Sequence, residues 1–276
     1  MGKIAVLITC HNRSEKTIAS LKSLFKNKIP DNDEIEVYLV DDGSTDGTSQ
    51  IVKNEFPCVN IIPGDGHLFW NRGMHLAWIT ACKKKDFDYY LWLNDDTILF
   101  NHALKVMLEY SKSIDNKRII VGATCSFEKK ITTYGGFSRS NQMLQPNKNW
   151  QDCHYFNGNI VLIPSFVFKK IGFIDYKFRH CLGDFDYGRR ASKLGFVHSL
   201  SPVHLGNCES HEKVPAWRDH SYPLFKRIGN LYSPLGNNPF EFFIFDKRHH
   251  GIFSAVFHFL TIHLRVFLPS LWKGNM

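Results

Sequence analysis

The 276-residue sequence contains no uninterrupted apolar run of about eighteen residues, which is the length an ordinary membrane-spanning helix needs. It has no C-x-x-C pair, and its seven cysteines are an odd number. The opening residues MGKIAVLITC are too short for a secretory signal and run into His11. These absences predict free thiols in a reducing compartment and no ordinary transmembrane helix.

No internal repeat or low-complexity segment interrupts the chain, and its composition is that of a globular protein. Apolar residues make up 43% and charged residues 22%, which is enough for a packed core. The net charge of +8, with His neutral, favours an anionic partner such as a nucleotide, anionic lipid or nucleic acid. Because acidic residues stand at the predicted strand ends, we expect no nucleic-acid partner.

Apolar runs alternate with segments of helical spacing in the first part of the chain. Strands are predicted at 3–9, 34–40, 59–63 and 89–93, and helices after Ser14 and at 49–56, 72–85 and 101–113. This alternation predicts a parallel sheet with helices on both faces. Such open sheets bind ligands beyond the carboxyl ends of their strands, where Thr9, Asp41 and Asp95 stand.

The middle of the chain is less regular. Strands are predicted at 118–127, 131–137 and 157–164, and residues 138–152 are polar and typical of a loop. A short helix is expected to begin in SFVFKKIG, and a longer one over 182–196 has an acidic start and a basic middle.

Acidic residues follow two of the predicted strands. Asp41, in VDDGSTDGT, can accept hydrogen bonds from a base or a ribose, with a plain Asx turn as the alternative. Asp95 and Asp96 follow the apolar run YYLWL, where adjacent carboxylates repel each other. Hard oxygen ligands suit Mg²⁺ or Mn²⁺, which can bridge to a diphosphate. The alternative is a solvated loop in which Asp95 caps a helix.

Two further segments carry candidate site residues. In LGDFDYGRR, Asp184 and Asp186 are two residues apart and cannot share a helical face. One of them can act as a general base, or both can complement the helix N-terminus. In GDGHLFWNRGMHLAW, Arg72 can match phosphate oxygens, and Trp70 can pack against a sugar or fill core.

Four ordered motifs, VLITCHNR, VDDGSTDGT, LWLNDD and GDFDYGRR, resemble those of the family-two inverting glycosyltransferases with a GT-A fold. The resemblance covers roughly residues 3–210. Within the family, the sequence is similar to the bacterial members that build cell-surface polysaccharides. It implies an α/β fold with a mostly parallel mixed sheet flanked by helices. It also implies a nucleotide-diphosphate sugar donor, Mn²⁺ or Mg²⁺, and direct displacement at the anomeric carbon.

The resemblance also implies roles for individual residues. Asp184 matches the catalytic base, Asp186 its neighbour, and Asp96 the metal ligand. The nucleotide and donor residues would be Thr9, His11, Arg13, Asp41, Arg72 and Asp95. The segment 156–164 would lie under the acceptor, where Asn157 and Asn159 are candidates for hydroxyl contacts, with turn formation as the alternative. Asp186 and Trp70 are further candidates for acceptor contacts. His204, or less well His211, would complete the metal shell.

The sequence departs from the family pattern at two positions. Asn94 stands where the metal motif often begins with Asp, and Gly183 stands where many members have Glu. A neutral amide ligates a metal less strongly than a carboxylate does.

The chain is expected to divide into a GT-A domain over 1–215 and an extension over 216–276. The domain would have a nucleotide-sugar half, about 1–125, and an acceptor half, about 126–215. In the extension, residues 246–273 predict an amphipathic helix with a wide apolar face and cations near its ends. We expect it to lie in the membrane interface, with packing on the domain or a homodimer contact as the alternatives.

The sequence therefore predicts a cytoplasmic enzyme, peripheral on the inner face of the cell membrane. It would be a metal-dependent hexosyl- or deoxyhexosyltransferase that acts on a hydroxyl of a glycan or polyprenyl-linked acceptor in O-antigen or capsule synthesis. One alternative is a nucleotidyltransferase that makes sugar nucleotides, although CHNRSEK is a poor version of its Gly-rich loop. Another is a non-catalytic scaffold of polysaccharide assembly.

Overall fold

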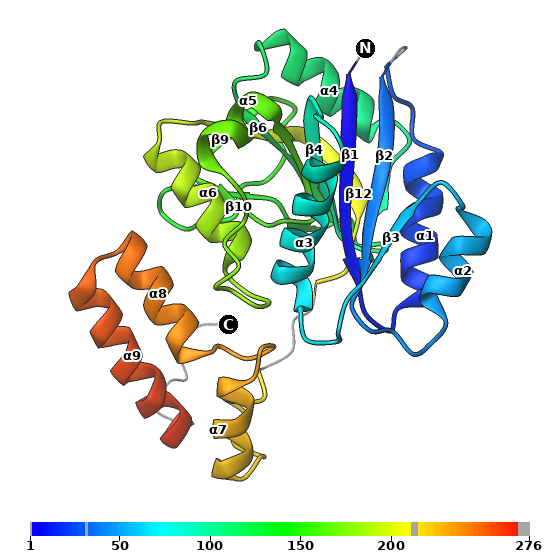
Figure 1. The fold of residues 1–276 in the computed structure, drawn as a ribbon. Helices are drawn as coiled ribbons and strands as arrows, with labels where there is room; N and C mark the ends of the chain where they lie inside the picture. The colour runs from blue at the N-terminus through cyan, green and yellow to red at the C-terminus, as the bar shows by residue number, and fades with distance from the viewer. Residues whose placement is uncertain (1, 31–32, 211–214, 270–276) are drawn as a thin grey trace. The chain divides into compact units, whose positions relative to one another are not determined.

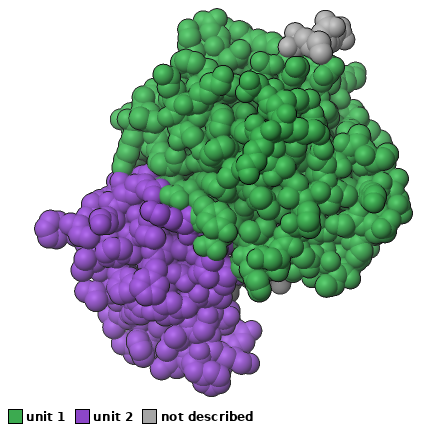
Figure 2. Space-filling view, in the orientation of Figure 1, with its two compact units in different colours: residues 1–176, 184–210 green, residues 177–183, 211–276 purple. Residues whose placement is uncertain are grey.

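The computed structural model describes residues 2–30, 33–210 and 215–269. The chain divides into two compact units (Figure 2), which are described separately. Unit 1 comprises residues 1–176 and 184–210, and unit 2 comprises residues 177–183 and 211–276. The short segment 177–183 therefore groups with the C-terminal region, although the sequence around it lies within the predicted domain.

A mixed sheet forms the centre of unit 1 (Figure 1). In spatial order, its main path is β3 (Asn60–Pro63), β2 (Glu34–Asp41), β1 (Lys3–Cys10), β4 (Tyr89–Leu93), β11 (Ile160–Pro164), β6 (Ile119–Cys125), β12 (His198–Asn207) and β5 (Ile98–Leu99). Strand β7 (Thr132–Tyr134) pairs with β6, and β9 (Gln151–Cys153) pairs with β12. Strands β8 (Gly136–Phe137) and β10 (Tyr155–Phe156) form a separate pair.

Strand direction brings the chemistry-bearing loops to one edge. Strand β1 is parallel to both β2 and β4, and Cys10 lies beside Asp41 while Leu7 lies beside Trp92. The residues of β1 after Lys3 are all buried, as expected of a strand covered on both faces. The segments that follow the carboxyl ends of β1, β2 and β4 therefore meet at the same edge of the sheet.

Two apolar layers cover the two faces of the sheet. One layer packs against α1 (Ser14–Phe25), α2 (Thr48–Glu55) and α4 (Ala103–Ser113). The other packs against α3 (Phe69–Lys84), α5 (Ser165–Ile171) and α6 (Gly183–Lys193). The predicted α/β class, a mostly parallel mixed sheet flanked by helices, is confirmed.

Several predicted boundaries differ from the observed ones because tertiary contacts set them. Helix α3 starts at Phe69, three residues before the predicted start at 72. The Phe69 N–H donates to Asp42 Oδ2 over 2.8 Å, which fixes this start. The predicted strand 131–137 divides into β7 and β8. The strand predicted over 157–164 is observed as β11, which begins only at Ile160. The last two residues of the predicted 138–152 loop belong to β9, which begins at Gln151.

Unit 2 contains α7 (Leu224–Tyr232), α8 (Pro239–His249) and α9 (Ile252–Phe267). The prediction of one helix over 246–273 is wrong in its bounds, because α8 ends at His249 and α9 begins afresh. Gly251, between them, has a φ of 90°, a conformation that residues with a Cβ rarely adopt. Helix α9 then packs against α8, with the rings of Phe243 and Phe259 5.9 Å apart. Residues 270–273 of the predicted helix lie outside the described residues.

Within the described ranges, no helix is both long and apolar enough to cross a lipid bilayer.

Gly73 sets how closely α3 approaches β1. A Cβ at this position would collide with Thr9 Oγ1 and would lie 2.8 Å from Thr9 Cβ. We expect Gly73→Ala to lower the free energy of unfolding by about 1–3 kcal/mol through overpacking, measured by urea denaturation. Gly229→Ala in α7 is the control, because no heavy atom lies within 4 Å of the added methyl. Equal stability of Gly73→Ala and the wild type would contradict this packing.

Candidate active site

The acidic pair after β4 is bridged by one guanidinium. Arg13 Nη1 lies 3.2 Å from Asp95 Oδ1 and 3.1 Å from Asp96 Oδ2. From the sequence, a metal ion was the predicted counter-charge for these adjacent carboxylates. In this structure Arg13, from the loop after β1, offsets their repulsion instead. Arg13 joins the ends of β1 and β4 at the edge of the sheet.

The surroundings of the pair change its acidity. Burial raises the pKa of Asp95 to about 7, the charge of Asp96 adds to this rise, and Arg13 opposes it. Cys208 Sγ lies 3.5 Å from Asp96 Oδ1. Burial and the nearby Asp96 raise the pKa of Cys208 to about 12, so this sulfur is a protonated thiol beside the carboxylate.

The metal prediction can be tested against the residues present. Over residues 2–30, 33–210 and 215–269, no three His, Cys, Asp or Glu side chains come together as a metal site. His204 Nε2 instead lies 2.8 Å from Thr132 Oγ1, and nothing in this contact links it to Asp96. His211 lies outside the described residues. The pair Asp95 and Asp96 still fits a Mg²⁺-type ion, which commonly binds one or two carboxylates together with substrate phosphates and water.

The loop after β2 is organised by two adjacent carboxylates. Asp41 is buried, and it accepts hydrogen bonds from Ser44 N over 3.0 Å and from the Ser49 hydroxyl, as in the Asx-turn alternative. Asp42, which sequence reasoning did not select, accepts from Gly66 N over 2.9 Å and from Phe69 N over 2.8 Å. Asp42 therefore anchors the loop that leads into α3.

The other predicted nucleotide residues lie around this edge. His11 is exposed after β1, with Nδ1 2.6 Å from the Asp42 carbonyl oxygen. Thr9 is buried against α3. Arg72 Nε donates to Tyr176 O over 3.0 Å, and its guanidinium lies 4.6 Å from the centre of the Tyr176 ring. These contacts direct Arg72 to the loop after α5.

Asp184 stands in the first turn of α6 with both carboxylate oxygens engaged by backbone. Gly158 N donates to Oδ2 over 2.9 Å, and Phe185 N donates to Oδ1 over 2.8 Å. Burial raises the pKa of Asp184 to about 6, although these N–H groups favour the ionised form. The carboxylate is therefore ionised at neutral pH and more basic than a solvated one, which suits proton abstraction.

Trp70 connects the acidic pair with Asp184. Its Nε1 donates to Asn94 Oδ1 over 2.7 Å. A Cβ added at Gly158 would lie 2.5 Å from the Trp70 ring and 3.4 Å from Asp184 Cβ, so the three residues are in close contact. The structure thus brings the NDD segment, Trp70 and Asp184 into one site, although they are far apart in sequence.

A family model described as glycosyl transferase family 2 matches residues 5–172, more than half of the chain. The chain belongs to glycosyl transferase family 2. Its relatives include an uncharacterised glycosyltransferase of Rickettsia typhi, 26% identical over 220 residues, which cover 71% of this chain and 62% of the relative. Another is a poly-β-1,6-N-acetyl-D-glucosamine synthase of Staphylococcus epidermidis, which is 29% identical over 111 residues. This match covers 38% of this chain and 24% of that synthase. The chain thus spans less than two thirds of either relative.

Solved structures support the same fold. TarS of S. aureus matches with a TM-score of 0.58 at 15% identity, covering 87% of this chain and 44% of TarS. GalNAc-T7, solved with UDP, GalNAc and Mn²⁺, matches with a TM-score of 0.60 at 14% identity, covering 78% of this chain and 45% of that one. At these identities the likeness establishes the GT-A fold alone, and the predicted fold family is confirmed.

Two residues predicted to contact the acceptor are buried and have partners within this family 2 chain. Asp186 is 0% exposed and pairs with Arg190 Nε over 2.8 Å, so its carboxylate supports α6 from within. Asn159 is also buried, and its amide donates to Cys208 Sγ over 3.5 Å. Asn157 is partly exposed and accepts from Gly135 N over 3.4 Å, so its acceptor role stays a prediction.

Besides Asp42, the sequence prediction also missed Gly158 and Cys208, which lie in the same site. Both depend on contacts between distant segments, since Cys208 lies 112 residues from Asp96 and Gly158 lies 26 from Asp184. Gly158 had one available signal, its position in the N-G-N turn directly before a strongly apolar strand.

The raised pKa of Asp184 predicts a pH-dependent stability. Its folded pKa, about 6, exceeds the ordinary value of 3.8, so the folded state binds more protons between these values and stability falls as pH rises through them. Asp184→Asn removes this titration. We expect the unfolding free energy of the variant, relative to wild type, to rise by up to about 3 kcal/mol between pH 4 and pH 7, measured by urea denaturation. A constant difference across this range would contradict the shifted pKa.

Proposed function

We propose that this family 2 chain is an inverting glycosyltransferase. It moves a hexosyl or deoxyhexosyl group from a nucleotide-diphosphate sugar to a hydroxyl of a glycan or lipid-linked acceptor in surface polysaccharide synthesis. The observation that carries the proposal is the contact chain from the acidic pair through Trp70 and Gly158 to Asp184. The names of the S. epidermidis synthase relative and of the glycosyltransferase of R. typhi support the reaction class.

In the proposed reaction, the acceptor hydroxyl gives its proton to the Asp184 carboxylate as its oxygen bonds to the sugar's C1. The bond from C1 to the diphosphate oxygen breaks on the opposite face, and the nucleoside diphosphate leaves with the electron pair. The N–H groups of Gly158 and Phe185 hold the carboxylate in one orientation. Arg13 places positive charge at the acidic pair. A divalent ion held by Asp96 would supply further positive charge to the diphosphate.

A screen of nucleotide sugars with and without Mn²⁺ tests the donor and the metal. A matching donor should raise the melting temperature, more with Mn²⁺ than without, because it binds only the folded chain. Product analysis by NMR should then show release of nucleoside diphosphate and inversion at C1. Release of inorganic diphosphate from a nucleoside triphosphate and a sugar phosphate would instead favour a nucleotidyltransferase. No turnover with any donor that binds would favour a scaffold.

We also propose that the chain is peripheral on the cytoplasmic face of the membrane through α9. Large apolar side chains of this helix are exposed, including Phe253 at 90%, Phe257 at 63% and Leu260 at 64%. A continuous stripe of this kind is typical of helices in a membrane interface. Lys247 and Arg248 in the last turn of α8 add positive charge suited to anionic headgroups.

Replacing both Phe253 and Phe257 by Ser tests the membrane proposal. Each Phe should contribute about 1.5–3 kcal/mol when buried in lipid, so flotation with phosphatidylglycerol-containing vesicles should weaken at least about tenfold. Phe166→Ser in α5, 51% exposed and in unit 1, is the matched control and should float like wild type. If wild type does not float and the double variant converts a dimer to a monomer in light scattering, the homodimer alternative holds instead.

A further inference from the structure

Three aromatic rings of unit 1 gather beside the proposed base. Phe185 directly follows Asp184 in α6. Its ring centre lies 5.0 Å from that of Tyr155 and 5.5 Å from that of Phe137. Phe137 and Tyr155 are paired residues of β8 and β10, and their rings stack 4.8 Å apart. Strand β10 leads into Gly158, whose N–H contacts Asp184, so the ring cluster continues from the catalytic site.

This ring cluster is separate from the hydrophobic core. The apolar layer on this face of the sheet includes the neighbouring Phe156 but none of the three rings. Tyr155 is 5% exposed, whereas Phe137 and Phe185 are only partly buried. Burial in the core therefore does not account for these two phenylalanines, and part of their apolar surface is open next to the base.

A side-chain amide is fixed at the rim of the ring cluster. Asn141 Oδ1 accepts from the Tyr155 hydroxyl over 3.1 Å and from Arg189 Nη2 over 3.1 Å. Because both donors hold the oxygen, the Nδ2 group faces away from them, and Asn141 is exposed. The Arg189 guanidinium also lies 4.4 Å from the centre of the Tyr155 ring, a cation–π contact. The two N–H donors of Asn141 are thus oriented for a ligand.

The loop that carries Asn141 is held by its own hydrogen bonds. Ser138 N donates to Gln142 O over 2.9 Å, and Asn141 N donates to Ser138 O over 3.1 Å. Gln142 N donates to the Ser138 hydroxyl over 3.2 Å. Asn141 has a φ of 61°, which Asn adopts more readily than most residues. The amide and the rings are therefore in place before a ligand binds, which lowers the ordering cost of binding.

An aromatic surface with a fixed amide at its edge is suited to a sugar ring. The C–H faces of a pyranose are apolar and can rest on an aromatic ring, while its hydroxyls need hydrogen-bond partners at the edge. The reacting sugar must place its hydroxyl at Asp184, so a sugar on Phe137 and Phe185 is the next one in the same glycan. A purely apolar ligand would leave the Asn141 amide unused.

We propose that Phe137, Phe185 and Asn141 bind the second sugar of the acceptor, so that the acceptor is a glycan of at least two sugar residues. The inference rests on the proposed function and deepens it, because it selects transfer to a growing glycan over transfer to a single lipid-linked sugar. An earlier glycosyl transfer must then supply this disaccharide.

Binding of defined sugars to the full chain tests this site. An array of immobilised mono-, di- and trisaccharides of hexoses, deoxyhexoses and N-acetylhexosamines identifies the best disaccharide. Saturation-transfer NMR then compares its affinity with that of its terminal monosaccharide. We expect wild type to prefer the disaccharide about tenfold. Asn141→Asp keeps the oxygen but replaces both N–H donors, so this preference should fall to about threefold. Phe137→Leu should reduce it to about the same extent.

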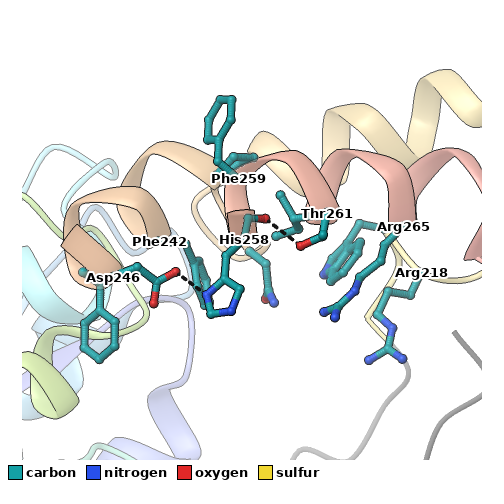
Figure 3. Close-up of a pocket in the computed structure, with 12 residues that line it drawn as sticks. Arg218, Phe242, Asp246, His258, Phe259, Thr261 and Arg265 are labelled. Carbon is teal, nitrogen blue, oxygen red and sulfur yellow. Dashed lines mark hydrogen bonds and ion pairs between the residues drawn. The ribbon is translucent and has the colours of Figure 1, made fainter. Parts of the chain in front are cut away.

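Two controls locate the effect. Asn147→Asp makes the same chemical change at an exposed residue of unit 1, where Asn147 Oδ1 accepts from Asn149 N over 3.1 Å. Thr261→Val changes a residue that lines a cavity of about 320 Å³ in unit 2 (Figure 3), a second place of a size suited to a small ligand. Both variants should keep the wild-type preference. If Thr261→Val removes it, the glycan binds in unit 2 and the proposed site is wrong.

Melting temperatures without ligand show whether each variant is folded, and Asn141→Asp tests the site even if Phe137→Leu is not. Equal affinity of wild type for both sugars, no glycan binding by wild type, or an unchanged preference in folded Asn141→Asp would overturn the site. Transfer by wild type without the disaccharide preference would leave the proposed function and remove this site. The preference without transfer from any nucleotide sugar that binds would leave a glycan-binding site and remove the proposed function.

Discussion

Asp184→Asn is expected to lower kcat by roughly two to four powers of ten, the usual contribution of a positioned general base. The amide keeps the size of the carboxylate and can still accept from Gly158 N or Phe185 N, so the fold around it should persist. What is lost is the carboxylate that can take the acceptor's proton at this position. The effect is measured as nucleoside diphosphate release with the true acceptor.

Asp186→Asn is the matched control for this experiment, because it lies in the same turn of α6 and carries the same chemical change. Its carboxylate faces inward to Arg190, so its loss should cost on the order of 3 kcal/mol in stability while leaving kcat of the folded protein nearly unchanged. The two variants should therefore separate catalysis from stability. Near-normal turnover of Asp184→Asn would show that another group accepts the proton.

The elements that could be predicted are those that local pattern determines. The strands β1 and β4 are apolar on both faces, so their short apolar runs stood out, and the acidic residues after β2 and β4 marked the edge where the loops meet. The start of α6 was also visible from its acidic first turn. In each case the signal lies within about ten neighbouring residues.

The elements that were missed depend on contacts between distant segments. The bridge from Arg13 to the acidic pair spans 82 and 83 residues, and spacing along the chain does not encode it. The break between α8 and α9 depends on one glycine inside an otherwise continuous helical pattern. Asp186 was predicted to contact the acceptor because it shares a motif with Asp184, and the structure shows it buried and paired with Arg190.

The Arg13 bridge also changes the interpretation of the acidic pair. Adjacent carboxylates at the end of a buried strand are tolerated here because a guanidinium from the neighbouring strand end contacts both of them and offsets part of their repulsion. Asp96, which Arg13 contacts here, is the carboxylate that would hold a divalent ion, and such an ion would supply positive charge to a diphosphate. The Arg13 guanidinium matches the geometry of carboxylate and phosphate oxygens alike.

Gly158→Ala is expected to lower kcat about a hundredfold, because a displacement of about 1 Å in a catalytic group has effects of this size. The new Cβ would lie 2.5 Å from the six-membered ring of Trp70, a rigid group held through its Nε1 by Asn94. Either the ring moves away from Asn94 or the backbone of Gly158 moves away from Asp184. Both movements disturb a contact that links the base to the donor side, and steady-state kinetics would measure the loss.

Gly135→Ala provides the matched control, since Gly135 O accepts from Asn157 N in the same region. Its added methyl would meet Leu200 Cδ1 at 3.2 Å, the end of a flexible side chain that can shift. Adding Trp70→Phe to Gly158→Ala removes the ring atoms that the methyl meets. The two changes should then be non-additive, with the double variant no slower than Trp70→Phe alone. If instead their effects multiply, Gly158 acts on Asp184 by some route other than the Trp70 ring.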